Sequence, residues 1–75
     1  MAEELSLAEL IVMHRKAAGL SRRELAMFSG VGKTVIYELE HGKETVRLDT
    51  LTRIFQTLNI QMRYDSPLLR SLDRA

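Results

Sequence analysis

Hydrophobic residues recur every three or four positions through most of this chain, which is the spacing of one face of an α-helix. The first row contains Leu7, Leu10 and Ile11, and a shorter one contains Leu25 and Ala26. Two later rows consist of Val35, Ile36 and Leu39 in residues 33–41, and of Leu48, Leu51, Ile54, Phe55 and Leu58 in residues 48–58. Together the four rows predict four amphipathic helices around a shared core.

Polar residues and glycines mark the predicted helix ends. Ser6 and Ser21 each have a glutamate three residues later, which is the spacing of a capping box at a helix start. Gly19 and Gly42 follow the first and third rows, where a glycine can adopt the left-handed backbone of a helix end. The stretch "SGVG" at residues 29–32 predicts a turn between the second and third helices, with Val31 directed into the core.

The hydrophobic period changes after residue 59. In residues 60–65, apolar residues alternate with polar ones, which predicts a β-strand. A lone strand leaves its backbone groups unpaired, so we expect it to pair with a second molecule; an extended tail packed on the domain surface is the alternative. The apolar positions are Ile60, Met62 and Tyr64. Residues 66–75 form a tail that could add a turn of helix or stay disordered.

The stretch "GVGKT" at residues 30–34 looks like the end of a nucleotide-binding loop. That loop reads G-x-x-x-x-G-K-[ST] and follows a buried strand. If Gly32, Lys33 and Thr34 were its last three residues, the leading glycine would stand at position 27, which is Met27. The preceding "RRELAMFS" is charged and rich in helix formers. The pattern therefore does not indicate an ATP or GTP site.

Composition narrows the class of protein further. Seventy-five residues predict one small domain, and the absence of cysteine rules out disulfides and thiolate zinc sites. Acidic residues stand where a signal peptide needs basic ones, and no apolar run is long enough to span a membrane, so we expect a soluble cytoplasmic protein. Net charge is +1, but residues 15–47 hold seven Lys or Arg against four Glu. This local excess suits a polyanion, although ordinary surface charge would also explain it.

Two short helices joined by a glycine-containing turn form a helix-turn-helix pattern. In that motif the second helix lies in the DNA major groove and its first residues contact base edges. The stretch "GVGKT" is then the turn and the start of a recognition helix. A helix N-terminus also suits phosphate, here that of the DNA backbone.

The sequence "GLSRRELAMFSGVGKTVIYELEHGK", followed by "VRLDTLTRIFQTLNI", resembles the Xre/Cro-type helix-turn-helix family over residues 7–59. The resemblance implies an all-α, four- or five-helix, lambda-repressor-like DNA-binding domain at residues 1–59. The following "IQMRYD" resembles HipB-type antitoxins, which implies a dimerisation strand at residues 60–65 pairing across a homodimer. It also implies a palindromic double-stranded DNA operator, autorepression and a HipA-type kinase toxin as partner.

Chemistry and family position together give the candidate site residues. Lys can donate to guanine, Thr can contact thymine and Glu can accept from cytosine, which makes Lys33, Thr34 and Glu38 base-reading candidates. Tyr37 could reach a base or a phosphate. All four could instead be ordinary surface residues. The phosphate-contacting candidates are Arg22, which stands where the family usually has Gln, Arg23, Lys43 and Arg47.

The resemblance also implies a structural ion pair between Arg15 and Glu40, and Gly32 replaces the usual hydroxyl residue at the third helix's N-cap. We expect no cofactor, no metal and no enzymatic activity, because no nucleophile–base or metal-ligand cluster is apparent. The sequence thus predicts a dimeric transcriptional repressor, in its specific form an antitoxin. The alternatives are a stand-alone Xre-type regulator and a protein-interaction adaptor with this fold.

Overall fold

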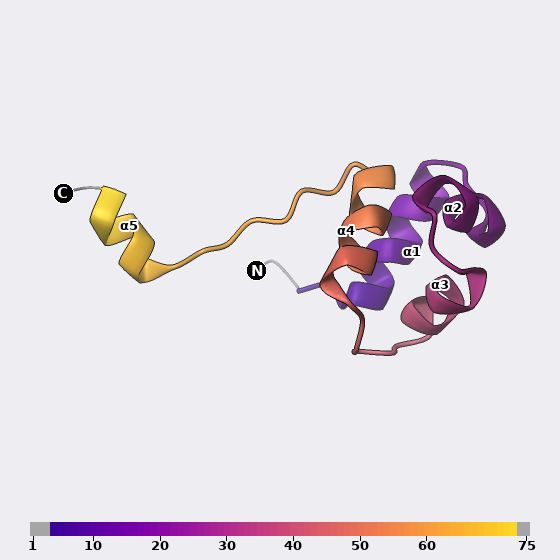
Figure 1. Ribbon diagram of the computed structural model, residues 1–75, viewed down its shortest axis with the longest axis horizontal. Coiled ribbons are helices and arrows are strands. Elements are labelled where there is room, and N and C mark those ends of the chain that lie inside the picture. Colours follow the sequence, from indigo (N-terminus) through magenta and orange to yellow (C-terminus); the bar gives the residue numbers. More distant parts are fainter. Residues whose placement is uncertain (1–3, 74–75) are drawn as a thin grey trace.

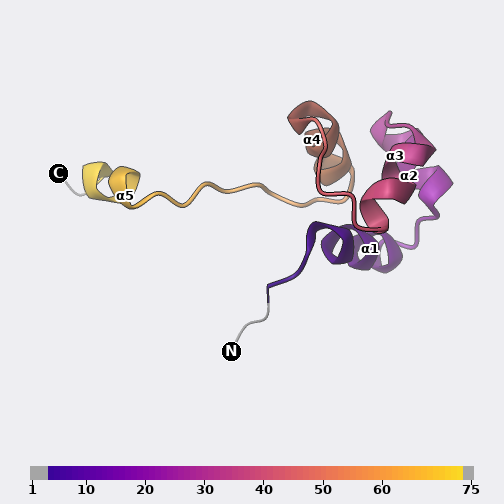
Figure 2. The same ribbon diagram turned by 90° about the horizontal axis from the view of Figure 1, so that it is seen from below.

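The computed structural model describes residues 4–73, and these residues form five helices (Figure 1). Helices α1 to α4 gather into one body, from which residues 60–66 and the last helix project (Figures 1 and 2). No helix in residues 4–73 is long and apolar enough to cross a membrane. The helices are α1 (Leu7–Ala17), α2 (Arg22–Ser29), α3 (Lys33–Glu40), α4 (Leu48–Thr57) and α5 (Pro67–Asp73).

The core lies between α1, α2, α3 and α4, with α2 packed against both α3 and α4. The predicted apolar rows supply it, which confirms the four-helix prediction. One residue of these rows behaves differently: Leu48, the first residue of α4, is 62% exposed. It lies on a side of α4 that α1, α2 and α3 leave open. The fully buried side chains are Ile11, Leu25, Ile36, Leu39 and Ile54.

Both predicted capping boxes are present. The Ser6 hydroxyl accepts from the Glu9 amide at 3.1 Å, and the Ser21 hydroxyl accepts from the Glu24 amide at 3.0 Å. In each box the glutamate carboxylate accepts from the serine amide in return. These bonds satisfy amide donors that a helix N-terminus leaves unpaired, and they fix where α1 and α2 begin.

The turn between α2 and α3 fixes the position of α3. Gly30 has φ +71°, in the left-handed region that favours glycine, and its amide donates to the Ala26 carbonyl at 3.0 Å. Val31 is buried in the core, as predicted. Ser29 is also buried, with its hydroxyl donating to the Leu25 carbonyl at 2.6 Å. Helix α3 ends at Glu40, one residue before the predicted end, because His41 has left helical geometry.

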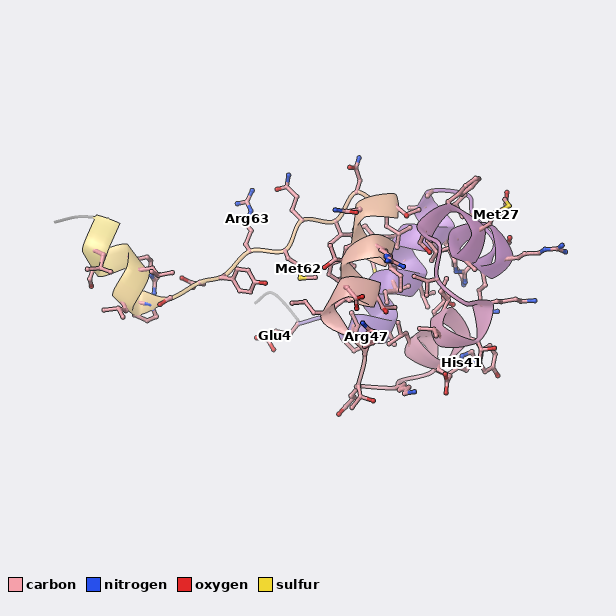
Figure 3. All side chains as sticks on the ribbon, in the orientation of Figure 1. Glu4, Met27, His41, Arg47, Met62 and Arg63 are labelled. Carbon is pink, nitrogen blue, oxygen red and sulfur yellow. The ribbon has the colours of Figure 1, made fainter. Side chains whose placement is uncertain are left out.

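The strand predicted at residues 60–65 is not formed in the described part of the chain, which contains helices and connecting segments only. A single chain with no other strand offers no edge to pair with, so residues 60–66 remain an extended segment without strand hydrogen bonds. Ile60 and Met62 pack partly against the core, whereas Tyr64 is exposed. Figure 3 shows Met62 and Arg63 on opposite sides of the segment, as strand periodicity requires.

Candidate nucleic-acid interface

A buried carboxylate holds two arginines at the base of the helix-turn-helix. Arg15 Nε donates to Glu40 Oε2 at 2.6 Å and Arg15 Nη2 donates to Glu40 Oε1 at 3.0 Å. Arg22 Nε donates to the same Oε1 atom at 2.8 Å. The Glu40 side chain is 1% exposed and that of Arg15 is 9% exposed. Glu40 therefore ties α1, α2 and α3 together from one point.

The arginines set the ionisation of this carboxyl group. Burial acts to raise the pKa of Glu40, but hydrogen bonds and charge from Arg15 and Arg22 outweigh it and hold that pKa below its usual range. Glu40 is thus ionised at neutral pH. Arg15 also donates from Nη1 to the Leu20 carbonyl at 3.0 Å, so the pair has the additional hydrogen bonds that a buried ion pair requires.

Arg22 connects this pair to the molecular surface. Its guanidinium lies 5.7 Å from the centroid of the Tyr37 ring, and Tyr37 stacks on His41 with ring centroids 3.9 Å apart. The Arg22 side chain is 39% exposed, and Glu40 occupies only its Nε. Its two Nη groups form no hydrogen bond within residues 4–73. A guanidinium held in this way suits bidentate contact with an oxyanion.

A basic recess of about 500 Å³ lies beside the start of α3. Four cationic side chains line it and no acidic one does. The capped N-terminus of α2 adds the positive end of a helix dipole. This combination of guanidinium, ammonium and helix N-terminus favours a phosphate group. The lining residues are Arg15, Ser21, Arg22, Arg23, Lys33 and Tyr37.

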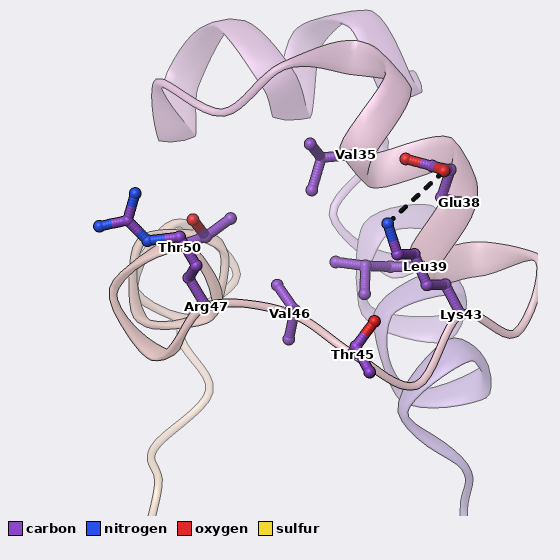
Figure 4. A pocket seen from close by; sticks show the side chains of 8 residues that line it. All are labelled: Val35, Glu38, Leu39, Lys43, Thr45, Val46, Arg47 and Thr50. Atoms are coloured by element: carbon purple, nitrogen blue, oxygen red, sulfur yellow. Dashed lines mark ion pairs between the residues drawn. The ribbon is translucent and has the colours of Figure 1, made fainter.

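A second recess of about 440 Å³ lies on the opposite edge of α3, against the loop that leads to α4 (Figure 4). Lys43 Nζ lies 3.7 Å from Glu38 Oε2 at one side of this recess, and Arg47 extends from the α4 N-terminus. Arg47 is strongly exposed and pairs with Asp49 at 3.2 Å. Each of these exposed pairs contributes little stability, so both cations can exchange partners at low cost.

The face of α3 between the two recesses is open. Lys33, Thr34 and Tyr37 are exposed, and Glu38 is half-buried beside Lys43. His41, stacked on Tyr37, lies on the same face and was not among the predicted site residues. Its position four residues after Tyr37 was the available signal, because residues at this spacing are neighbours on a helix surface. Figure 3 shows His41 at the outer edge of α3.

The arrangement presents one helix with a polar face, flanked on both edges by cations. An α-helix fits the major groove of B-DNA, where side chains reach base edges and cations beside the helix meet the two phosphate backbones. The candidate residues at the turn and around α3 therefore lie together. Ile60, Met62 and Tyr64 lie elsewhere, along the segment that leaves α4.

Comparisons with known proteins agree with this geometry. A family model described as Helix-turn-helix matches residues 11–64. The restriction-modification controller protein C.AhdI from Aeromonas hydrophila has a similar structure, with 27% identity and a TM-score of 0.69, over 75% of this chain and 85% of that one. A HipB variant in an O2 20mer complex is 24% identical with a TM-score of 0.72, over 89% and 97%. No curated protein sequence matches the chain.

Proposed function

This chain belongs to the Helix-turn-helix family, and we propose that it is a sequence-specific transcriptional repressor that binds a palindromic operator as a homodimer. The observation that carries the proposal is the placement of cations on both edges of an exposed α3. Arg22 and Arg23 stand on one edge, and Lys43 and Arg47 stand on the other. Phosphate contacts from two sides would fix α3 in the groove, where Lys33, Thr34, Tyr37 and Glu38 would read bases.

Dimerisation would give the protein its specificity for one DNA sequence. A helix-turn-helix monomer reads only a few base pairs, and two recognition helices about 34–36 Å apart read two half-sites on one side of the duplex. Residues 60–65 are the proposed dimerisation strand, with Ile60, Met62 and Tyr64 at the interface. Antiparallel pairing around a two-fold axis would provide the hydrogen-bonding partner that a single chain lacks.

In its most specific form, the protein is the antitoxin of a HipA-type kinase toxin and represses its own operon. The amino-acid sequence of α4 and the alternation of apolar and polar residues at positions 60–65 support this version. A regulator without a toxin is the second candidate, and the likeness to the controller protein C.AhdI at 27% identity favours it. The neighbouring genes separate the two candidates, because an adjacent kinase-like reading frame is expected only for the antitoxin.

Selection of bound fragments from random duplex DNA by the purified protein tests the shared proposal. We expect enrichment of a palindrome whose half-sites lie about one helical turn, roughly 10 base pairs, apart. Recovery of sequences without a common motif, at an affinity no better than that for bulk DNA, would contradict sequence-specific binding. Enrichment of a single half-site without symmetry would support sequence-specific DNA binding and contradict binding as a homodimer.

A further inference from the structure

Arg22 is tied to the interior of the protein through one atom of its guanidinium. Its Nε donates to Glu40 Oε1 at 2.8 Å, and the Glu40 carboxylate is held by two further hydrogen bonds from Arg15. Because the Glu40 side chain is only 1% exposed, this acceptor has little freedom to move. One hydrogen bond fixes the position of Nε but leaves the guanidinium plane free to turn about it. A second contact is needed to fix the plane.

The Tyr37 ring provides that second contact. Arg22 Cζ lies over the ring, 5.7 Å from its centroid, which is within the range of a cation–π interaction. Arg22 is the first residue of α2 and Tyr37 lies within α3, so the contact joins the two helices of the motif. Contacts at Nε and at Cζ together restrict the guanidinium and hold its two Nη groups at the basic recess.

Tyr37 is in turn held by His41, one helical turn later. The two rings stack with centroids 3.9 Å apart and an interplanar angle of 23°, and His41 Nδ1 lies 2.7 Å from the Tyr37 carbonyl oxygen. Tyr37 is 52% exposed, so this stacking limits the rotamers of a side chain that solvent would otherwise leave free. Both the stacking and the cation–π contact involve the ring, and neither requires the tyrosine hydroxyl.

We propose that Tyr37 is a positioning residue for Arg22, whose guanidinium its ring holds ready for a phosphate of the DNA backbone. The inference rests on the DNA binding in the proposed function and deepens it by dividing one side chain into two roles. The Tyr37 hydroxyl remains available to a base, whereas the ring acts through Arg22 and carries no sequence information.

The cost of ordering a side chain gives the size of the expected effect. Immobilising a flexible side chain on binding weakens affinity by roughly two- to tenfold. An arginine that Glu40 and Tyr37 already hold avoids part of this cost when it meets a phosphate. Loss of the ring should therefore weaken DNA binding by roughly two- to tenfold for each bound subunit. The loss should be the same for every DNA sequence, because phosphate contacts do not read bases.

Binding to a scrambled duplex at low salt isolates the role of the ring, because base reading contributes nothing there. Tyr37→Ala should show the full loss. Tyr37→Phe keeps the ring and removes only the hydroxyl, so it should bind this duplex as the wild type does. Equal losses in the two variants would overturn the proposal, since the hydroxyl would then be the group that matters.

A double-mutant cycle tests whether the ring acts through the arginine. In the Arg22→Ala background, Tyr37→Ala should cause little further loss on the scrambled duplex, because the ring then has no guanidinium to hold. Losses that multiply in the double variant would show that the ring contacts DNA by itself, and they would overturn the proposal.

A measurement on the free protein separates this inference from the proposed function. Carbon relaxation NMR of the Arg22 Cδ methylene reports how far the side chain is fixed, and it needs no DNA. We expect a lower order parameter in Tyr37→Ala and the wild-type value in Tyr37→Phe. An unchanged order parameter in Tyr37→Ala would refute the positioning even in a protein that binds its operator tightly. The expected order parameters in a protein that does not distinguish operator from scrambled duplex would support the positioning while the proposed function fails.

Discussion

At the scale of single residues, Arg22 and Lys33 line the same basic recess but are expected to act differently on DNA. Arg22→Ala should weaken binding to all sequences about equally and reduce the salt slope by roughly 1, as for a phosphate contact. Lys33→Ala should cost roughly 1–3 kcal/mol on the best site and relax the preference at one base pair. Titrations at several salt concentrations, on the best site and on a scrambled duplex, measure both effects. A uniform loss for both variants would remove Lys33 from the base-reading set.

Glu40 is the residue on which the packing of the motif depends. Glu40→Ala should lower the free energy of unfolding by about 3 kcal/mol, because it leaves the buried Arg15 without its partner. Glu44→Ala removes the same charge from an exposed loop position and should change stability by less than about 0.5 kcal/mol. Thermal unfolding compares the two variants. Equal melting temperatures would contradict the structural role of the Arg15–Glu40 pair.

The lowered pKa of Glu40 also predicts a pH dependence. A carboxyl group whose pKa is lower in the folded state than in the unfolded state adds stability above its unfolded pKa, about 4.3. That contribution is lost as the pH falls through the folded-state pKa. The stability difference between the wild type and Glu40→Gln should therefore be constant near neutral pH and shrink below about pH 4. A difference that does not change down to acid unfolding would mean that Glu40 is not ionised in the native protein.

At the scale of elements, the glycines at the two ends of the turn have opposite requirements. Gly32, the N-cap of α3, has φ −62° and no side-chain cap, and a Cβ there would meet only Val35 Cγ2, at 4.0 Å. Gly32→Ser should therefore stabilise the protein by about 0.5 kcal/mol through the cap and the less flexible unfolded chain. Gly30 has φ +71°, so Gly30→Ser should destabilise it by about 1 kcal/mol. Chemical denaturation measures both, and the same sign for both would contradict this account of the turn.

The helices were predictable from sequence to within about one residue where a local signal existed. The capping boxes of Ser6 and Ser21 fixed two starts because the bonds involve residues only three apart. The Arg22–Glu40 contact was not predictable, since it joins residues 18 apart whose approach depends on packing. The exposure of Leu48 was missed for a related reason. Helical periodicity identifies an apolar face but does not tell which part of that face another helix of the same chain covers.

At the scale of the whole molecule, we expect the four-helix body to fold on its own and the C-terminal segment to serve dimerisation. Within residues 4–73, the buried hydrophobic core lies between Ile11 and Leu58. Truncation after Asn59 should thus leave a folded domain that sediments as a monomer, or as a much weaker dimer, and binds palindromic DNA poorly. Circular dichroism, sedimentation and DNA titration test this. A truncated protein that remains a tight dimer with unchanged operator affinity would exclude residues 60–65 as the dimerisation element.

The β-strand predicted at residues 60–65 is the part of the fold that a single chain cannot form. Alternation of Ile60, Met62 and Tyr64 encodes an extended backbone, but hydrogen bonds to a second strand depend on another molecule. The same distinction applies to α5, whose leucines indicate an apolar contact without identifying the surface in contact.

A comparison of two dissociation constants tests most directly whether α3 reads DNA sequence. The dissociation constant of the full-length protein is determined by fluorescence anisotropy for the selected operator and for a scrambled duplex of equal length, at physiological salt. We expect the operator to bind at least about 10³-fold more tightly, as specific regulators do. Thr34→Ala, which changes no charge, should reduce this ratio while leaving the scrambled duplex nearly unaffected. Equal dissociation constants for the two duplexes would contradict sequence reading by α3.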